Sequence, residues 1–317
     1  MLPRQVPAAT MPRFVSDDEV ARILRFDAVS ATIEQAFESL AHGRAAIKPR
    51  VRSECAGIKL SSMGALWPDA KLAGEKVYTT VAGRFGFLFN LFDLEAGTPV
   101  AVMQADELTR VRTAALTALA VSRGAAATRK LAVFGAGVQG RSHIEALVRA
   151  LPFDRVDVVD LSDVSSWCAR ASRQFEVAIR QCGTLAALHE ADVVVTATRS
   201  KQPLFDGTLL KPGAFVAAVG TSLPDGRELD NATLSRAGRI VVEWKPQSCV
   251  EAGEIVLGRV AGAVDDARVI DLVELFSGQA RWRSRDDEIV VFKSVGVGLT
   301  DLAAASLVWQ ELGAAAS

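Results

Sequence analysis

The sequence predicts an α/β fold in two parts, on three observations. From residue 129 onward, nearly continuous apolar segments alternate with amphipathic ones, which is typical of a doubly wound parallel sheet with helices on both faces. One apolar segment enters a glycine-rich turn, in the stretch LAVFGAGVQGRSHIEAL at residues 131–147. Before residue 105, short extended segments follow one another with turns between them, which predicts a smaller, sheet-rich α+β part at the N-terminus.

The N-terminal part begins with a predicted helix. Ser16 and Glu19 form a capping box, and the apolar residues that follow keep a helical spacing up to Gly43. Residues 1–14 contain no apolar stretch of the kind found in a secretory signal, so we expect a disordered leader there. Met11 is an alternative start of the chain.

Extended segments come next, and a helix closes this part. We expect that helix from Asp106 to Ser122, with its end at Gly124, and an antiparallel sheet before it. The segments predicted as strands are KPRVRSE (48–54), GIKLSSMGALW (57–67), KVYTTVAG (76–83), FGFLFNLFD (85–93) and PVAVMQ (99–104).

The second part is expected to contain at least six apolar strands. They lie in the segments KLAVFGAG, RVDVVDL, ADVVVTATR, GAFVAAVGT, RIVVEW and EIVVFK, with helices predicted in GRSHIEALVRAL and SSWCARASRQF and at the C-terminus.

Composition excludes several classes of function. The chain has 317 residues, 23% of them charged, and a formal net charge of −1, so no overall field draws it to nucleic acid or to an anionic membrane. No apolar run reaches the ~20 residues of a membrane span. The four cysteines are scattered and form no CxxC pair, which argues against a zinc site or a disulfide framework and favours a cytoplasmic location. We therefore expect no metal.

The glycine-rich turn has the spacing of a dinucleotide-binding loop. Gly135, Gly137 and Gly140 form G-x-G-x-x-G directly after a strand and at the start of a helix. The first glycine permits the tight turn, the second lets a pyrophosphate approach the backbone, and the third lets helix and strand pack closely. The N–H groups at the helix start, near Val138 and Gln139, then face the phosphates. This loop predicts a Rossmann-type domain that binds a dinucleotide.

The next strand ends at Asp160, about 20 residues beyond the last glycine, where such domains hold the adenosine ribose. An acid there accepts hydrogen bonds from the 2′-hydroxyl of NAD and repels the 2′-phosphate of NADP. Leu161 and Ser162 supply no arginine for that phosphate, so NAD(H) is favoured over NADP(H). Asp160 has an alternative, compatible role as the N-cap of the following helix. The other expected cofactor contacts are Thr198, Gly220 and Lys293.

Six segments together resemble the ornithine cyclodeaminase/mu-crystallin family: KPRVR, GEKVYT, GTPVAVMQADELTRVRTAALTALA, VFGAGVQGRSHIEAL, AAVGTSLPDGRELD and VFKSVGVGLTDLAAA. They occur in the family's order and cover nearly the whole chain after residue 45. The resemblance implies a homodimer. It also implies a substrate-binding and dimerisation domain at residues 1–124, completed by residues 300–317, and a Rossmann domain at residues 125–299. Members of the family carry out hydride chemistry on amino and imino acids.

The resemblance assigns the substrate groups to Arg50, Lys76 and Arg112. An α-imino acid carries a carboxylate, which arginine grips with two hydrogen bonds. A lysine beside the reacting carbon holds the carboxylate as well, or moves a proton if burial lowers its pKa. Arg112 stands out on the sequence alone, because the helix around it, VRTAALTALA, is otherwise apolar. Arg52 is an alternative to Arg50, two residues further along the same predicted strand.

The sequence departs from the family at an acid. Ornithine cyclodeaminases and archaeal alanine dehydrogenases carry a catalytic aspartate in a G-A-D-x-P loop, and Ser222 takes that position here, as in mu-crystallin-like members. A hydroxyl is no general base near neutral pH without an activating partner. Asp225 is a weaker candidate to replace the acid. A second acid, associated with ornithine recognition, aligns with Ser61.

These features favour a nicotinamide-dependent reductase of imino acids, or an amino acid dehydrogenase. A cyclic ketimine such as Δ1-pyrroline-2-carboxylate is the expected substrate, with Lys76, Arg112 and Ser222 as catalytic residues. Three alternatives stay open at this point: an ornithine cyclodeaminase that makes proline with bound NAD, a cofactor-dependent small-molecule binding protein, and a structural dimer with a vestigial site.

Overall fold

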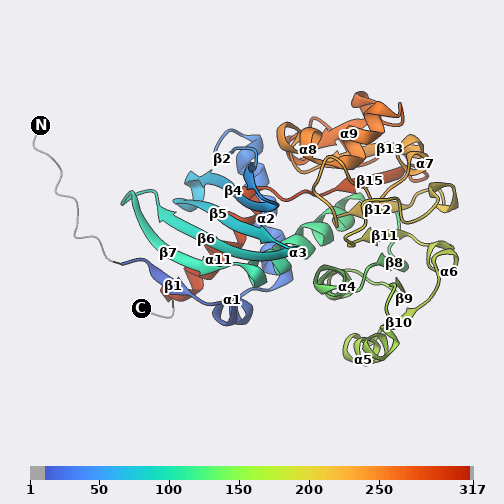
Figure 1. The fold of residues 1–317 in the computed structure, drawn as a ribbon, viewed down its shortest axis with the longest axis horizontal. Coiled ribbons are helices and arrows are strands. Elements are labelled where there is room, and N and C mark those ends of the chain that lie inside the picture. Colours follow the sequence, from blue (N-terminus) through green and yellow to red (C-terminus); the bar gives the residue numbers. More distant parts are fainter. Residues whose placement is uncertain (1–10, 315–317) are drawn as a thin grey trace, which may run out of the picture.

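The computed structural model describes residues 11–314, in which two β-sheets lie side by side and helices pack against both (Figure 1). The first sheet ends at Gln104 and the second begins at Lys130. Helix α3 (Asp106–Gly124) connects them and contacts both α2 of the first part and α4 of the second. No helix within the described range is both long enough and apolar enough to cross a membrane.

The first sheet has seven strands in the order β1-β7-β6-β5-β4-β2, with β3 also paired to β4. All its pairs are antiparallel except β1 with β7, so the predicted antiparallel sheet is confirmed. The strands are β1 (Arg13–Val15), β2 (Ala46–Ile47), β3 (Val51–Cys55), β4 (Ile58–Trp67), β5 (Leu72–Val81), β6 (Arg84–Asp93) and β7 (Thr98–Gln104).

Two details of the N-terminal prediction are wrong. The predicted strand 48–54 is interrupted, because Pro49 has no N–H for a sheet and Arg50 lies between β2 and β3. The expected disordered leader falls mainly outside the described residues, but its last residues belong to β1, which pairs in parallel with Ala101–Met103 of β7. Pairing to β7 holds this segment in place even though its sequence has no clear alternation.

The predicted first helix is two helices, α1 (Asp17–Ile23) and α2 (Phe26–Ala41). The capping box of Ser16 and Glu19 is confirmed. Arg25 is extended, with φ −120° and ψ 140°, and redirects the chain between the helices. Because of this bend α1 contacts β7, whereas α2 contacts α10 (Leu272–Phe276). Tertiary packing therefore overrides a helical pattern that continues through the bend.

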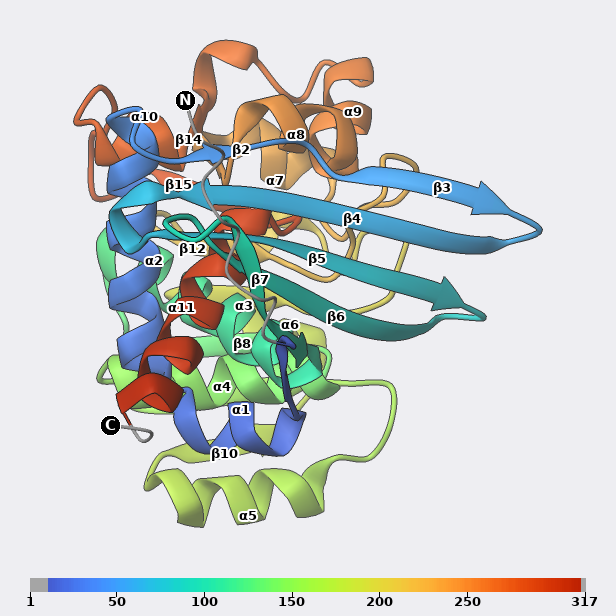
Figure 2. The same cartoon turned by 90° about the vertical axis from the view of Figure 1, so that its left-hand side faces the viewer.

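The C-terminal helix α11 (Gly298–Ala314) returns to the first sheet and packs on β4, β5 and β6 (Figure 2). Ten of its residues, from Gly298 to Val308, are buried, so it forms the core of this part together with α2 and α3. The helices cover one face of the sheet. On the other face large apolar side chains stay exposed, among them Leu60, Leu66, Leu88 and Phe92.

The second sheet has eight parallel strands in the order β10-β9-β8-β11-β12-β15-β13-β14, which confirms the predicted doubly wound fold. Every residue of β8, β11, β12 and β15 is buried. The strands are β8 (Lys130–Phe134), β9 (Arg155–Val159), β10 (Ala178–Gln181), β11 (Val193–Thr196), β12 (Phe215–Ala218), β13 (Ala237–Val242), β14 (Val269–Asp271) and β15 (Ile289–Lys293).

The strand order reverses at β8, whose neighbours are β9 on one side and β11 on the other. In such sheets ligands bind in the crevice outside the carboxyl ends of the strands at this reversal. The helices of this part are α4 (Val138–Ala150), α5 (Ser165–Phe175), α6 (Thr184–Leu188), α7 (Asn231–Arg236), α8 (Lys245–Glu251), α9 (Gly253–Val260) and α10. Strands β10 and β14 were not predicted, because both are short and neither lies in a long apolar run.

Candidate active site

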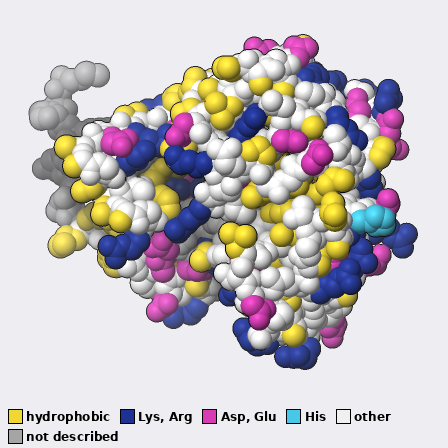
Figure 3. Space-filling model, turned by 45° about the vertical axis from the view of Figure 1, so that its right-hand side comes forward, with side chains coloured by type: hydrophobic (Ala, Val, Ile, Leu, Met, Phe, Trp, Pro, Cys, Tyr) yellow, Lys and Arg dark blue, Asp and Glu magenta, His cyan; other side chains and the backbone are white. Residues whose placement is uncertain are grey.

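A cavity of about 860 Å³ lies between the two sheets, at the reversal of strand order. Its walls come from β5 and β6 with the turn between them, the first turns of α3, the glycine loop, and the loops after β11, β12 and β15. The space-filling view shows a hollow with lysine and arginine side chains, coloured dark blue, at its edge (Figure 3). Most of the expected site residues line this cavity, whereas Gly135, Gly140, Asp160 and Lys293 do not.

Lys76 and Arg112 meet at a single carboxylate. The Nζ of Lys76, on β5, donates to Oδ1 of Asp301 at 2.8 Å, and the Nε of Arg112, on α3, donates to the same oxygen at 2.9 Å. All three residues are buried, and Lys76 and Arg112 line the cavity. The Nη1 of Arg112 and the Oδ2 of Asp301 have no hydrogen-bond partner. Arg112 therefore keeps a free donor for a ligand.

Burial lowers the pKa of the Lys76 amine to about 7, and the positive charges of Arg112 and Arg50 act in the same direction. Asp301 opposes them by stabilising the charged form. A lysine with a pKa near 7 changes its protonation state readily under physiological conditions. Lys76 is thus suited both to hold an anion and to give up a proton.

The guanidinium group of Arg50 lies near that of Arg112, with Gly296 beside both. Arg50 donates from Nη2 to the carbonyl oxygens of Val295 and Gly296, at 2.5 and 3.0 Å, and from Nη1 to Glu251 at 2.7 Å. Gly296 has a φ of +81°, and a Cβ on it would lie 3.1 Å from Nη2 of Arg112 and 3.4 Å from Nη2 of Arg50. The left-handed φ favours glycine here, and a side chain would crowd both guanidinium groups.

A buried glutamate shapes this loop from behind. Glu243, at the end of β13, accepts hydrogen bonds from the backbone N–H groups of Val295 and Gly296, both at 2.7 Å. Burial raises the pKa of the Glu243 carboxyl. The glutamate holds the loop after β15 in the conformation that presents its carbonyl oxygens to Arg50.

The site carries a surplus of positive charge. Three cations, Arg50, Lys76 and Arg112, are opposed by Asp301 and Glu251. Glu251 also forms an ion pair with Arg52, at 2.6 Å. An anionic ligand would complete the balance, and a carboxylate matches the free guanidinium donor in shape and charge.

Of the three residues considered for the two acids that the sequence lacks, only Ser222 lines the cavity. Ser222 lies in the loop after β12 and lines the cavity, and its carbonyl oxygen accepts from Nη2 of Arg52 at 3.3 Å. Asp225 is exposed and pairs with Lys201 at 3.0 Å, so it lies on the surface and replaces no acid in the cavity. Ser61 is buried on β4, and its hydroxyl has no hydrogen-bond partner, but it does not line the cavity.

The geometry of the glycine loop fits a dinucleotide. Gly135 has a φ of +93°, and a Cβ on Gly140 would lie 1.8 Å from the carbonyl oxygen of Gly135, so close packing requires glycine at both. A Cβ on Gly137 would meet nothing within 4 Å, which leaves an open space above the first turn of α4. Gln139 contributes a buried Oε1 without a partner, and Gly137, Val138 and Gln139 line the cavity.

Asp160 is bonded to the loop rather than to the next helix. Its Oδ2 accepts from the N–H of Ala136 at 2.6 Å and its Oδ1 from the N–H of Ser162 at 2.8 Å. The N-cap of α5 is Val164, so the alternative role of Asp160 as N-cap is wrong. The carboxylate lies beside the glycine loop at the end of β9.

Thr198 and Gly220 line the cavity and are tied together by a buried glutamate. Glu228 accepts from the N–H and hydroxyl of Thr198, at 2.8 and 2.7 Å, and from the N–H of Gly220 at 2.8 Å. This carboxylate therefore fixes the loops after β11 and β12 relative to each other.

Lys293 does not reach the cavity, contrary to the prediction of a cofactor contact. It is fully buried, donates to the carbonyl oxygen of Thr221 at 2.6 Å, and pairs with Glu254 at 3.0 Å. Because both partners lie inside the protein, the lysine supports the loop after β12 from behind.

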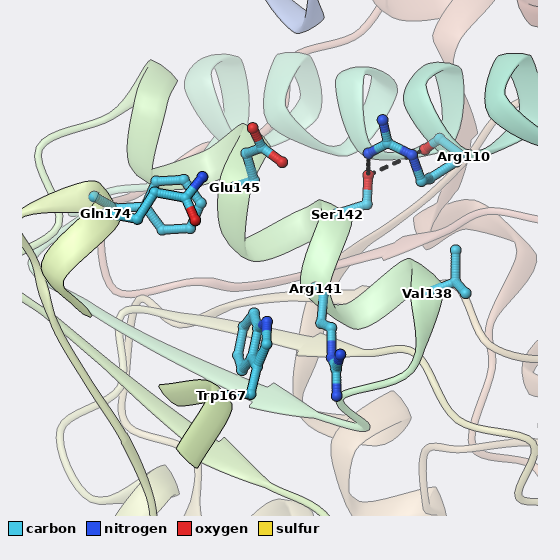
Figure 4. A pocket seen from close by; sticks show the side chains of 8 residues that line it. Arg110, Val138, Arg141, Ser142, Glu145, Trp167 and Gln174 are labelled. Atoms are coloured by element: carbon cyan, nitrogen blue, oxygen red, sulfur yellow. Dashed lines mark hydrogen bonds between the residues drawn. The ribbon is translucent and has the colours of Figure 1, made fainter. Parts of the chain in front are cut away.

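A smaller cavity of about 250 Å³ is lined by residues of α3, α4 and α5 (Figure 4). Arg110 and Val138 line both cavities. Arg110 donates to the hydroxyl of Ser142 at 3.1 Å, and the guanidinium of Arg141 lies 5.0 Å from the ring centre of Trp167. Among the described residues, none of the buried polar atoms that lack a hydrogen-bond partner belongs to the lining of the smaller cavity, whereas Nη1 of Arg112 and Oε1 of Gln139 belong to that of the larger one.

Sequence reasoning missed the carboxylates Asp301, Glu251 and Glu228. Asp301 left a signal, because it is a lone acid in the apolar segment GLTDLAAAS, as Arg112 is a lone base in VRTAALTALA. Two isolated opposite charges in two apolar helices predict a buried pair. Glu228 left no such signal, because the sequence around it, PDGRELDN, is polar, and Glu251 is not an isolated acid, because Glu254 follows three residues later. No cluster of potential metal ligands occurs in residues 11–314.

Residues 11–315 match the model of the ornithine cyclodeaminase/mu-crystallin family. The ketimine reductase mu-crystallin of Mus musculus is 34% identical over 221 residues, which cover 69% of this chain and 67% of the relative. A Δ1-pyrroline-2-carboxylate reductase of Bacillus cereus is 28% identical over 249 residues, which cover 77% of this chain and 74% of the relative.

Solved structures with the same fold cover nearly the whole chain. The structure described as a probable ornithine cyclodeaminase from Bordetella pertussis Tohama I has a TM-score of 0.92 and 40% identity, over 96% of this chain and 98% of that one. The iminosuccinate reductase of Paracoccus denitrificans in complex with NAD⁺ has a TM-score of 0.89 and 26% identity, over 96% of this chain and 97% of that one.

Proposed function

This chain belongs to the ornithine cyclodeaminase/mu-crystallin family, and we propose that it is an NAD(H)-dependent reductase that acts on a cyclic ketimine such as Δ1-pyrroline-2-carboxylate. The observation that carries the proposal is the juxtaposition of the cations Lys76 and Arg112 with a dinucleotide loop around one cavity. The reductases among its relatives support it.

The residues divide the work by position. Arg112 holds the carboxylate through its free Nη1, and Arg50, whose guanidinium also binds Glu251 and the loop carbonyls, adds a second positive charge beside it; together they orient the imine carbon. When bound, a reduced nicotinamide would supply a hydride, which would form a new C–H bond at that carbon as the C=N bond becomes a C–N single bond. The nitrogen takes up a proton, and Lys76, with its pKa of about 7, is the donor in the cavity. The reverse reaction is an amino acid dehydrogenation.

The glycine loop is assigned to the pyrophosphate, with Gly137, Val138 and Gln139 in contact with it and Thr198 and Gly220 on the nicotinamide side. Gly135 and Gly140 shape the loop. We assign Asp160 to the ribose hydroxyls, which makes NADH the preferred reductant over NADPH. The exposed Leu161 next to it offers no cation for a 2′-phosphate.

A homodimer built on the first sheet is part of the proposal. Leu60, Leu66, Leu88 and Phe92 lie on one face of that sheet and are each 39–50% exposed. A contiguous exposed apolar face of this kind marks an interface in soluble proteins. The four cysteines are free, and we assign the protein to the cytoplasm.

The second candidate function, ornithine cyclodeamination, is favoured by the Bordetella pertussis structure with its description as a probable ornithine cyclodeaminase. Ser222 disfavours this function, because it takes the position of the aspartate that the resemblance assigns to cyclodeamination. A pure binding protein is a third candidate, which the proton-donating position of Lys76 disfavours.

A panel of cyclic and linear imino acids with NADH and NADPH, followed by absorbance at the nicotinamide band, tests the proposal. We expect consumption of NADH with a cyclic ketimine. Thermal stabilisation by the same compounds without turnover would identify a binding protein instead. Absence of both would leave only a vestigial site.

A further inference from the structure

The inner face of the first sheet changes character along β5 and β6. At one end its side chains are covered by α11 and completely buried, as for Phe89 and Leu91. At the other end Tyr78, Phe85 and Phe87, on the same face, line the cavity instead. We call these three residues the aromatic wall.

The aromatic wall is a preformed apolar surface. The ring centres of Tyr78 and Phe87 are 5.0 Å apart, and those of Phe85 and Phe87 are 5.5 Å apart with their planes at 8°. Phe85 remains 50% exposed although it lines a cavity. Binding of an apolar ligand group over such an exposed ring removes apolar surface from water and is therefore favourable.

The aromatic wall lies next to the cations that hold a carboxylate. The Nζ of Lys76 is 5.4 Å from the ring centre of Phe87 and 6.0 Å from that of Tyr78. An imino acid bound through its carboxylate carries its side chain on the neighbouring carbon. Because the aromatic wall adjoins Lys76, we expect that side chain to contact it.

The charges at the opening disfavour a cationic side chain. Arg84, the first residue of β6, and Arg199, after β11, line the cavity, and neither forms an ion pair within the part of the chain described. Two acids, Asp106 and Glu107, line it on the side of α3, but Glu107 is engaged with Arg110 at 2.8 Å. A terminal ammonium group near the wall thus faces more positive than negative charge.

We propose that the aromatic wall is the side-chain subsite, and that the protein prefers imino acids with a large apolar or aryl group over those with a methyl-sized or charged one. The inference rests on the proposed reductase function and adds the substrate class to it. Its physical basis is contact between the apolar side chain of the substrate and the three rings of the aromatic wall. The cations that bind the carboxylate place the side chain beside these rings.

The test uses imines formed in place from methylamine and 2-oxo acids, with NADH and the full-length protein. We expect kcat/KM with phenylpyruvate to exceed that with pyruvate by about tenfold or more, since a well-packed apolar group gives ~10–200-fold discrimination. Phe87→Ala should reduce this ratio about tenfold, and Phe87→Leu should give an intermediate value. Leu185→Ala removes an exposed apolar side chain on α6, far from the cavity, and should leave the ratio unchanged.

Equal kcat/KM values for the two imines, or a ratio that Phe87→Ala leaves unchanged, would overturn the inference. A preference for the imine of 2-oxoglutarate would overturn it as well, and would assign Arg84 and Arg199 to a distal carboxylate. If none of these linear imines is reduced, the cyclic ketimine alone decides the proposed function, and the subsite is tested by thermal shift with NAD⁺. Greater stabilisation by N-methyl-phenylalanine than by N-methyl-alanine, lost in Phe87→Ala, would support it, and equal stabilisation would overturn it.

Discussion

Lys76 on β5 and Asp301 on the last helix, 225 residues apart in sequence, form a buried ion pair with 2.8 Å between Nζ and Oδ1. The first sheet provides the lysine, and the C-terminal helix that returns to this sheet provides its counter-charge. The site is therefore assembled only when the C-terminal helix has packed on the first sheet. The pair also sets the protonation of the lysine, because Asp301 raises the Lys76 pKa while burial lowers it.

The pH dependence of the reductase should follow this pair. Lys76 has a pKa of about 7, and its charged form, which binds the carboxylate and donates the proton, exists below that pH. We expect kcat/KM to fall as the pH rises through about 7. Asp301→Asn removes the charge that raises the pKa, so the fall should move to lower pH. Initial rates from pH 5 to 9 measure both profiles.

Asp301→Glu is the control, because it keeps the negative charge and should restore much of the wild-type profile. Asp301→Asn also leaves two buried cations with less compensation, which typically costs ~3–5 kcal/mol of stability, so thermal unfolding is recorded for each variant. Identical pH profiles in folded wild type and Asp301→Asn would show that Asp301 does not set the protonation of Lys76.

The glycine loop offers a matched pair of substitutions. A Cβ on Gly140 would overlap the carbonyl oxygen of Gly135, at 1.8 Å, whereas a Cβ on Gly137 meets nothing within 4 Å. Gly140→Ala should therefore lower the melting temperature. Gly137→Val should keep it and lose NADH binding, because its side chain enters the space assigned to the pyrophosphate. NADH titration by fluorescence checks this, and unchanged affinity in Gly137→Val would refute the assignment.

The extent to which the sequence predicts this molecule follows from how local each signal is. The glycine loop and the strand before it are contiguous, so residues 131–147 predict both a fold and a ligand. The roles of Lys76 and Arg112 came from the family resemblance. Their common partner Asp301 was missed, because pairing across 225 residues is a property of packing. Lys293 was misplaced for a related reason: its position after an apolar strand does not reveal on which side of the loop it lies.

The cofactor preference should depend on Asp160. Its carboxylate lies beside the glycine loop, bonded to the N–H of Ala136 at 2.6 Å, and Leu161 is fully exposed next to it. We expect a lower KM for NADH than for NADPH. The double variant Asp160→Ser with Leu161→Arg should reverse the preference, because it removes a repulsive charge and adds a partner for the 2′-phosphate. A wild-type protein that already prefers NADPH would contradict the assignment of Asp160.

The open face of the first sheet should control the oligomeric state. Leu88 and Phe92, on β6, are 42% and 39% exposed, opposite to the face that α11 covers. Leu88→Glu with Phe92→Glu puts two charges on this face and should convert a dimer into a folded monomer. Light scattering coupled to size exclusion measures the mass. Leu185→Glu, on α6 of the other part, is the control and should stay dimeric. A monomeric wild type at micromolar concentration would remove the basis for the interface.

The reaction should stop at reduction of a preformed ketimine, without production of proline from ornithine. The cyclodeaminase needs a base to accept a proton from an ammonium group, and the loop after β12 presents Ser222 to the cavity, while Asp225 pairs with Lys201 at the surface. Loss of a positioned base typically lowers a rate by about 10²–10⁴-fold, enough to abolish one activity and spare the other.

Reduction requires only the carboxylate-binding cations, the hydride and a proton, so Lys76→Ala and Arg112→Ala should each abolish turnover and retain NADH binding. Ser222→Asp is the sharpest comparison, because it restores the missing acid and should raise any release of ammonia from ornithine with NAD⁺. Proline and ammonia formed by the wild-type protein at a rate comparable to ketimine reduction would instead establish the cyclodeaminase.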